Sequence, residues 1–204
     1  MNLKNLFIAA IAIVTMSFIS AGSLTRAERK YAIDLMQQTR QDLLKKISGL
    51  TEEQLNFKAD TSSWSVAECV EHLAISESNL FGLTEMALKE PADPSKRSEV
   101  KMSDEAFVKL IADRSTKRKT NEALQPAGKF GSFEGVVQEF KSKRDNHIKY
   151  IQTTSDDLRN HYYDFPFGKA DAYQTVLLIA AHTTRHTEQI EEIMKHPDFP
   201  KKGK

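Results

Sequence analysis

Two histidines four residues apart, His182 and His186, are the residues of this chain best placed to do chemistry. They lie in the stretch DAYQTVLLIAAHTTRHTEQIEEIMK, residues 171–195, whose apolar residues recur at helical spacing. At about 100° per residue, both imidazoles fall on the same face as Ile179 and Ile190, the face that should be buried. Side chains at positions i and i+4 of a helix lie roughly 5–6 Å apart at Cβ, so two imidazoles can bind one metal ion.

Two interpretations of this pair remain open at this point. Buried histidines also occur as hydrogen-bonded core residues, and an HxxxH spacing arises readily by chance. The pair does not match the metalloprotease motif HExxH, because Thr183 stands where that motif has its general-base glutamate. A metal site therefore needs a third ligand from another part of the chain.

A third histidine, His72, lies on the predicted inner face of a helix spanning residues 66–89. At a rise of 1.5 Å per residue, His72 lies roughly 9 Å from the start of its helix, and His186 lies roughly 14 Å from the end of its own. Antiparallel packing of the two helices would therefore bring the three imidazoles to a similar height. Three neutral imidazoles with an open position form the ligand set of a catalytic divalent-metal site, whereas a structural zinc site normally has four protein ligands.

Helical patterns account for most of the remaining chain. The four long helices are predicted at residues 25–48, 66–89, 132–154 and 172–195. A fifth helix is predicted at 103–124, and a single helical turn at 51–57. No strand alternation of useful length is present. Amphipathic helices of this length favour a four-helix bundle, and the long segment between the second and third helices permits a crossover connection. The predicted fold class is therefore all-α.

Several polar residues fall on the inward faces of these helices. Arg144 and His147 interrupt the apolar stripe of residues 132–154. A buried Arg144 requires an acidic partner or carbonyl acceptors, and it is also a candidate to pair with an anionic substrate. His147 is interpreted as a core histidine with a backbone partner. Ser76 and Gln189 share faces with the histidines, so both are candidates for contacts to the ligands or the substrate.

Composition and charge restrict the possible partners. The 204 residues include 29 lysines and arginines against 28 acidic residues, which gives a formal net charge of +1. This balance lacks the basic surplus of nucleic-acid-binding proteins, so no nucleic acid partner is predicted. The charged run RSTKRKTNE, residues 114–122, is interpreted as a solvated surface, with contact to an anionic partner as the alternative. The single cysteine, Cys69, excludes an intramolecular disulfide.

The first 22 residues have the features of a secretory signal peptide. A lysine precedes the apolar run of residues 6–19, and small residues precede a cleavage point after Gly22. Because this run is shorter than the ~20 residues that span a membrane, cleavage is preferred over an uncleaved anchor, and no membrane span is expected afterwards. We therefore expect an exported, periplasmic protein whose single domain occupies residues 23–204.

Taken together, these residues resemble the DinB-like superfamily of bacterial four-helix-bundle proteins. The matching segments are WSVAE at 64–68, HL at 72–73, Gly168, YQ at 173–174, HTTRHTEQI at 182–190, and Arg144 after Phe140. The resemblance covers about residues 27–194. It implies an up-down-down-up bundle in which His72, His182 and His186 hold a divalent metal ion, commonly nickel or zinc. In this chain an extra helical insert lies between the second and third helices.

The same resemblance implies a small-molecule substrate and a homodimer. Relatives of this type include thiol-dependent transferases, isomerases and metal hydrolases. The export signal is atypical of them, and the insert around residues 95–125 would either cover the site or form a partner surface. The expected function is a divalent-metal-dependent enzyme, hydrolase- or transferase-like, although no general base is apparent. Two alternatives stay open, a non-enzymatic metal- or ligand-binding envelope protein and a helical interaction domain with a vestigial triad.

Overall fold

The computed structural model describes residues 23–201, so the proposed leader lies outside the described residues. The main body is a bundle of four long helices, α1 (Arg26–Ile47), α3 (Val66–Lys89), α5 (Phe133–Thr153) and α6 (Ala172–Met194). A short helix, α2 (Glu52–Asn56), joins α1 to α3. The predicted all-α bundle is confirmed, with the long helices beginning and ending within about two residues of their expected bounds. Within 23–201, no helix combines the length and the hydropathy needed to cross a bilayer.

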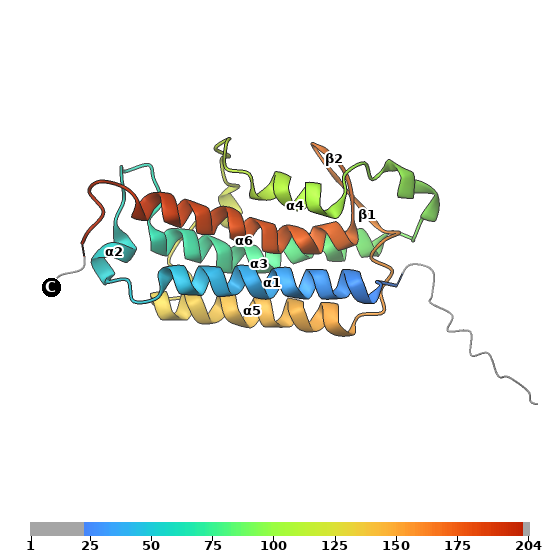
Figure 1. Cartoon of the computed structure of the whole chain (residues 1–204), viewed down its shortest axis with the longest axis horizontal. Coiled ribbons are helices and arrows are strands. Elements are labelled where there is room, and N and C mark those ends of the chain that lie inside the picture. The colour runs from blue at the N-terminus through green and yellow to red at the C-terminus, as the bar shows by residue number, and fades with distance from the viewer. Residues whose placement is uncertain (1–22, 202–204) are drawn as a thin grey trace, which may run out of the picture.

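The four helices run up, down, down and up (Figure 1). α1 and α6 run in parallel, since the Tyr173 hydroxyl at the start of α6 donates to the Glu28 carbonyl near the start of α1 at 2.6 Å. α3 and α6 are antiparallel, since the hydroxyls of Thr84 and Thr175 meet at 2.7 Å near the end of one helix and the start of the other. This antiparallel pair is the arrangement that the three histidines required.

The predicted helix starts rest on local side-chain chemistry that the structure contains. Thr25, Thr51 and Ser65 each form a complete capping box with the residue three positions later. Each box satisfies N–H groups that have no acceptor within the helix. At α6 the box is only half formed. The Asp171 carboxylate accepts from the Gln174 backbone at 2.8 Å, but the Gln174 side chain donates instead to the connection before α4.

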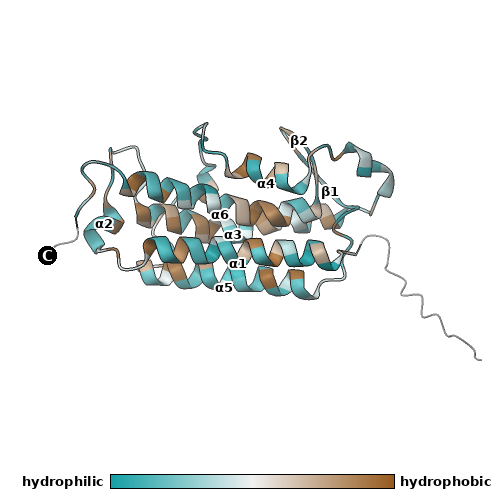
Figure 2. Cartoon of the chain, in the orientation of Figure 1, coloured by the Kyte–Doolittle hydropathy of each residue, from teal (hydrophilic) through white to brown (hydrophobic). Residues whose placement is uncertain are grey.

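The connection between α3 and α5 is less helical than predicted. It contains two short 3₁₀ helices, η1 (Pro94–Glu99) and η2 (Glu122–Leu124), and one α-helix, α4 (Asp104–Ala112). The prediction of a helix over 103–124 is therefore wrong beyond Ala112. Residues 113–122 contain no apolar side chain, so a continued helix would have no face to bury. Figure 2 shows this loop as hydrophilic, whereas the bundle helices carry apolar and polar patches.

A short β-hairpin is a second difference from the prediction. β1 (Tyr162–Phe165) pairs antiparallel with β2 (Gly168–Asp171), and Tyr162 lies opposite Asp171. Strands of four residues are too short to give a readable alternation, which is why none was predicted. Gly168 has φ 131°, a backbone conformation that favours glycine. Because β2 ends directly at α6, the hairpin helps to fix where that helix begins.

Arg159, in the loop before the hairpin, connects three helices at this end of the bundle. Its guanidinium binds Glu28 of α1 at 2.7 Å, Asp104 of α4 at 2.6 Å, and Asp171, the N-cap of α6, at 2.9 Å. It also lies 4.0 Å from the ring centroid of Tyr173. Burial raises the pKa of Asp171, although the charge of Arg159 opposes that shift. One cation thus holds together carboxylates from three elements, and Arg97 forms a second ion pair with Asp171.

The insert changes the surroundings of α6. Its helix α4 places Phe107 and Ile111 in a cluster with Leu178 of α6, and Figure 1 shows α4 lying along the outer side of the bundle. Arg185 lies on a face of α6 whose polar pattern is typical of an exposed surface, but only 6% of it is exposed. The insert covers this face, and the backbone carbonyls of Asp113 and Thr116 accept from the Arg185 guanidinium.

Candidate metal centre

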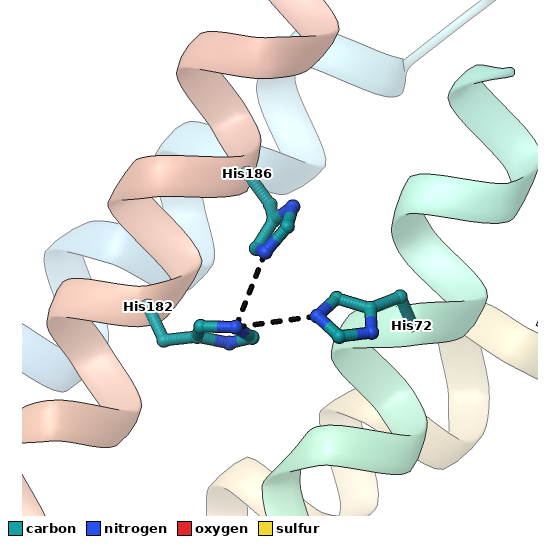
Figure 3. A group of neighbouring side chains, drawn as sticks. All are labelled: His72, His182 and His186. Carbon is teal, nitrogen blue, oxygen red and sulfur yellow. Dashed lines mark hydrogen bonds between the residues drawn. The ribbon is translucent and has the colours of Figure 1, made fainter. Parts of the chain in front are cut away.

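The three predicted histidines come together between α3 and α6. His72 projects from α3, and His182 and His186 project from α6 toward it (Figure 3). The Nε2 atom of His182 lies 3.2 Å from Nε2 of His72 and 3.1 Å from Nε2 of His186. One ring nitrogen from each residue lies within 4.8 Å of the others. The structure therefore brings the predicted triad to one point.

The donor set fits a divalent metal ion. Two imidazole nitrogens bound to one zinc ion at 2.0–2.1 Å in a tetrahedral arrangement lie ~3.3 Å apart. The measured separations of 3.1 and 3.2 Å between Nε2 atoms are close to that value. Three imidazoles on one side of the ion leave positions open on the other side, as in catalytic sites.

Acceptors outside the triad fix the tautomers of two of the rings. Nδ1–H of His72 donates to the backbone carbonyl of Leu124 at 2.9 Å, and Nδ1–H of His186 donates to Oε1 of Gln189, also at 2.9 Å. With the proton on Nδ1, the lone pair of Nε2 faces the centre of the triad, which is how such second partners orient metal ligands. Gln189 is thus placed as predicted. Leu124 could not be identified from sequence, because any residue type supplies a backbone carbonyl.

Two further side chains border the triad. The ring centroid of Trp64 lies 4.8 Å from that of His72 and 6.0 Å from that of His186, so the indole closes one side. The Ser76 hydroxyl lies 3.4 Å from Nε2 of His72 and is almost completely buried. Ser76 is therefore placed against the triad, as its position on the helix indicated. His182 is the most exposed of the three histidines.

The environment keeps the triad uncharged. Burial lowers the pKa of His72. Burial and the neighbouring imidazoles lower the pKa of His182 well below its usual value. Burial, reinforced by His72, lowers the pKa of His186 to about 3. Because the neutral imidazole is the form that binds metal, the triad is in its ligand form at neutral pH.

Arg144 is the one predicted site residue that the structure places elsewhere. It is completely buried and pairs with Glu77 of α3, at 2.6 and 3.1 Å to the two carboxylate oxygens. The remaining guanidinium hydrogens go to protein oxygens, including the hydroxyls of Thr39 (2.9 Å) and Thr183 (2.7 Å). A substrate contact would require breaking this buried pair, so we assign Arg144 to the packing of the bundle.

His147 completes this buried group in a way the sequence did not indicate. A backbone partner was expected, but Nδ1 of His147 donates to the Glu77 carboxylate at 3.0 Å, and its ring stacks on Phe81 with centroids 4.6 Å apart. Glu77 itself was missed. The signal for it was Arg144, whose place on an apolar stripe required an acid on a facing helix. Glu68, in contrast, serves the capping box of α3 and does not orient His72.

A family model described as the DinB superfamily matches residues 35–190, which include the triad and all four bundle helices in whole or part. The chain belongs to the DinB superfamily. The resemblance stated from the sequence motifs is thereby confirmed. Because the insert reaches the triad through Leu124, it covers part of the site of this DinB protein.

Two proteins of Bacillus subtilis are similar to this DinB protein. The uncharacterized protein YuaE of strain 168 is 25% identical over 162 residues, which cover 79% of this chain and 96% of YuaE. The solved structure of YfiT, described as a probable metal-dependent hydrolase with an unusual four-helix bundle topology, matches with a TM-score of 0.55. The match has 15% identity and covers 85% of this chain and 89% of YfiT. The likeness to YfiT shows a shared fold.

Replacing Gln189 with leucine is expected to weaken metal binding without removing a ligand. The substitution leaves Nδ1 of His186 without its acceptor, so the ring loses both its orientation and its fixed tautomer. Loss of such a partner typically lowers metal affinity by about 10–100-fold. Competition with a chromogenic chelator measures the change. Gln138, exposed on α5, provides the control as Q138L, and equal affinities for the two variants would contradict the expectation.

Proposed function

We propose that this protein is a divalent-metal-dependent enzyme acting on a small molecule, with His72, His182 and His186 as its metal ligands. The observation that carries this proposal is the convergence of three Nε2 atoms, two of them with lone pairs directed inward by outside acceptors. The description of YfiT as a probable metal-dependent hydrolase supports the same assignment. Nickel and zinc both suit an all-imidazole ligand set.

The roles of the chain's own residues follow from their contacts. A divalent ion supplies a Lewis acid that lowers the pKa of bound water toward ~7 or polarises a substrate. Leu124 and Gln189 hold two imidazoles in the binding tautomer. Trp64 excludes water from one side of the triad. The Ser76 hydroxyl is placed to exchange a hydrogen bond with a group bound beside His72. Hydrolysis and group transfer are both compatible with these roles.

Metal content and turnover test the proposal together. Elemental analysis of purified protein should give about one nickel or zinc ion per chain. Activity in a screen of ester, amide and thiol-transfer substrates should disappear on chelation and return on adding the metal back. Wild-type turnover that survives complete chelation would refute the enzymatic assignment, and protein without metal that cannot be loaded would refute the site itself.

Metal removal should also lower thermal stability. A metal at 100 times its Kd stabilises the folded state by about 2.7 kcal/mol, which corresponds to a Tm shift of ~5–10 °C in a domain of this size. Scanning calorimetry of the metal-loaded protein with and without chelator measures the shift. The same scan on H182A provides the control, because a chelator effect that persists without a complete triad would come from another site.

A non-enzymatic metal- or ligand-binding envelope protein is the second candidate. It is favoured by one observation: among residues 23–201, no carboxylate forms a hydrogen bond with the triad, so no acidic general base touches it. This candidate predicts stoichiometric metal and a Tm that falls on chelation, with no turnover in the substrate screen. Turnover that depends on the triad would exclude it.

We also propose that the protein is exported, that its leader is cleaved after Gly22, and that the remaining chain acts in the periplasm. The lysine, the apolar run and the small residues of the first 22 positions support this location. N-terminal sequencing of the protein from a cell fraction tests it, and a chain that still begins at Met1 would support an anchor instead.

A homodimer is proposed on the family resemblance, and light scattering during size exclusion tests it.

A further inference from the structure

We propose that the substrate is a small anion whose carboxylate or phosphate group is bound at the triad with the help of a cationic strap, residues 113–124 of the insert. This inference rests on the proposed metal site and adds the chemical class of its ligand. It departs from the interpretation of residues 114–122 as only a solvated surface. The position of the strap, its charges and the absence of acids at the triad support it.

The strap is attached on both sides of the triad. On the α6 side, Arg185 donates to the backbone carbonyls of Asp113 and Thr116, the second at 2.8 Å. On the α3 side, the carbonyl of Leu124 accepts from His72 at 2.9 Å. The chain between these attachments therefore passes from one ligand-bearing helix to the other. In Figure 1 it is the loop between α4 and α5.

Two arginines lie next to the ligands. Arg114 donates to Oε1 of Gln189 at 3.3 Å, and the same oxygen accepts from His186, so only one side chain separates this guanidinium from a ligand. Arg185 follows His182 by three residues and is almost completely buried. In the part of the chain that the structure describes, its hydrogen-bond acceptors are carbonyl oxygens, and it forms no ion pair. The Asp113 and Glu192 carboxylates lie near enough to offset part of its charge, but neither forms a direct ion pair with it.

The exposed middle of the strap adds further positive charge. Lys117, Arg118 and Lys119 are exposed and form no ion pair within residues 23–201. Over the whole strap, four basic residues face two acids, Asp113 and Glu122. The Asp113 carboxylate already accepts from the backbone and hydroxyl of Ser115 within the loop. Basic side chains are thus available to a ligand, whereas the strap offers little negative charge to repel one.

The triad itself contributes no negative charge. Three neutral imidazoles leave a divalent ion with its full charge, unlike ligand sets that contain a carboxylate. The two arginines next to the ligands, Arg114 and Arg185, add positive charge. The acids of this region already have partners, since Glu192 binds Arg114 at 2.7 Å, Glu77 binds Arg144, and the Asp113 carboxylate accepts from Ser115. A neutral ligand would leave this positive charge unbalanced, whereas an oxyanion compensates it, and guanidinium groups suit carboxylate and phosphate oxygens.

Anion titrations of nickel-loaded protein test the inference. Inorganic phosphate, acetate and neutral acetamide are added at low ionic strength while the nickel absorption spectrum and the metal content are recorded. We expect phosphate and acetate to bind at least ~10-fold more tightly than acetamide, with the preference reduced as salt screens the exposed charges. The ratio of phosphate to acetate affinity then identifies which oxyanion the site favours.

A matched pair of variants separates the strap from overall charge. K117Q/R118Q should weaken phosphate binding by about 5–10-fold, because it removes two positive charges from the strap. K141Q/K149Q removes the same charge from α5 and should leave the affinity unchanged. Equal binding of acetamide and the anions by the nickel-loaded protein overturns this inference alone, as does an equal effect of both double variants. A chain that takes up no nickel overturns the proposed metal site together with it.

Discussion

Replacing His182 with alanine is expected to reduce the metal content of the purified protein from about one ion per chain to nearly none. His182 is the member of the triad whose Nε2 lies within 3.2 Å of the Nε2 atoms of both His72 and His186, so its loss leaves two separated nitrogens. Loss of an outer partner alone costs about 10–100-fold in affinity, and loss of a ligand should cost ~100-fold or more. Elemental analysis and chelator competition measure the change.

His196 supplies a matched control for this experiment. It lies beyond the end of α6, with its ring centroid 5.6 Å from that of Phe57, and takes no part in the triad. H196A should retain full metal content and any activity that the wild type shows. Circular dichroism should give H182A a native helical spectrum, since the substitution removes a partly exposed side chain and not a core residue. Folded H182A with stoichiometric, tightly bound metal would contradict the assignment of the ligands.

Replacing Arg144 with methionine is expected to destabilise the bundle more than any surface substitution. The variant leaves Glu77, which is 1% exposed, as a buried carboxylate that has lost its arginine and keeps only the hydrogen bond from His147. Removing one partner of a buried ion pair typically costs about 3–5 kcal/mol, or ~10 °C or more in Tm for a domain of this size. Chemical denaturation measures it. K143M, at a neighbouring exposed pair, should change stability by less than ~1 kcal/mol.

The pH dependence distinguishes an unpaired carboxylate from simple loss of packing. In the wild type, burial would raise the pKa of Glu77, but the charge of Arg144 and the hydrogen bond from His147 outweigh it and hold the pKa below 4.5. The pair's stabilisation is therefore present above pH 4.5 and is lost as the pH falls below it. Without Arg144, burial should raise the pKa, so the deficit of R144M should be largest near pH 7 and smaller near pH 5.

A second variant separates the ion pair from the shape of the side chains. The double variant E77L/R144M places apolar groups at both positions and should recover part of the loss, because neither charge is left buried alone. Equal stabilities for R144M and K143M, or a deficit of R144M that does not change with pH, would contradict the role assigned to this pair.

Local interactions explain why so much of this fold could be predicted. The helix starts at Thr25 and Ser65 depend on residues three positions away, and the pairing of His182 with His186 depends on one turn of one helix. His72 could be added because its inward face and its height along the helix are also local properties. The candidate ligands were therefore available from periodicity alone, together with the direction that α3 must take relative to α6.

The parts that could not be predicted depend on contacts between distant segments. The face of α6 that bears Arg185 has a polar pattern, and only the folded insert shows that it is covered. The carbonyl of Leu124 that fixes His72 has no signature in sequence. Glu77 has the composition of a surface residue until Arg144 is placed opposite it. In each case the deciding partner comes from another element, so a single-helix pattern carries no information about it.

The connection made by Arg159 has a consequence for how the protein unfolds. Because one guanidinium holds carboxylates of α1, α4 and the start of α6, the insert belongs to the same cooperative unit as the bundle. We therefore expect the insert to unfold together with the bundle. Deleting it to open the site would remove Asp104 from this network and Leu124 from His72 in one step. Access to the triad is therefore coupled to the global stability of the domain, and the insert cannot be trimmed without a thermodynamic cost to the whole fold.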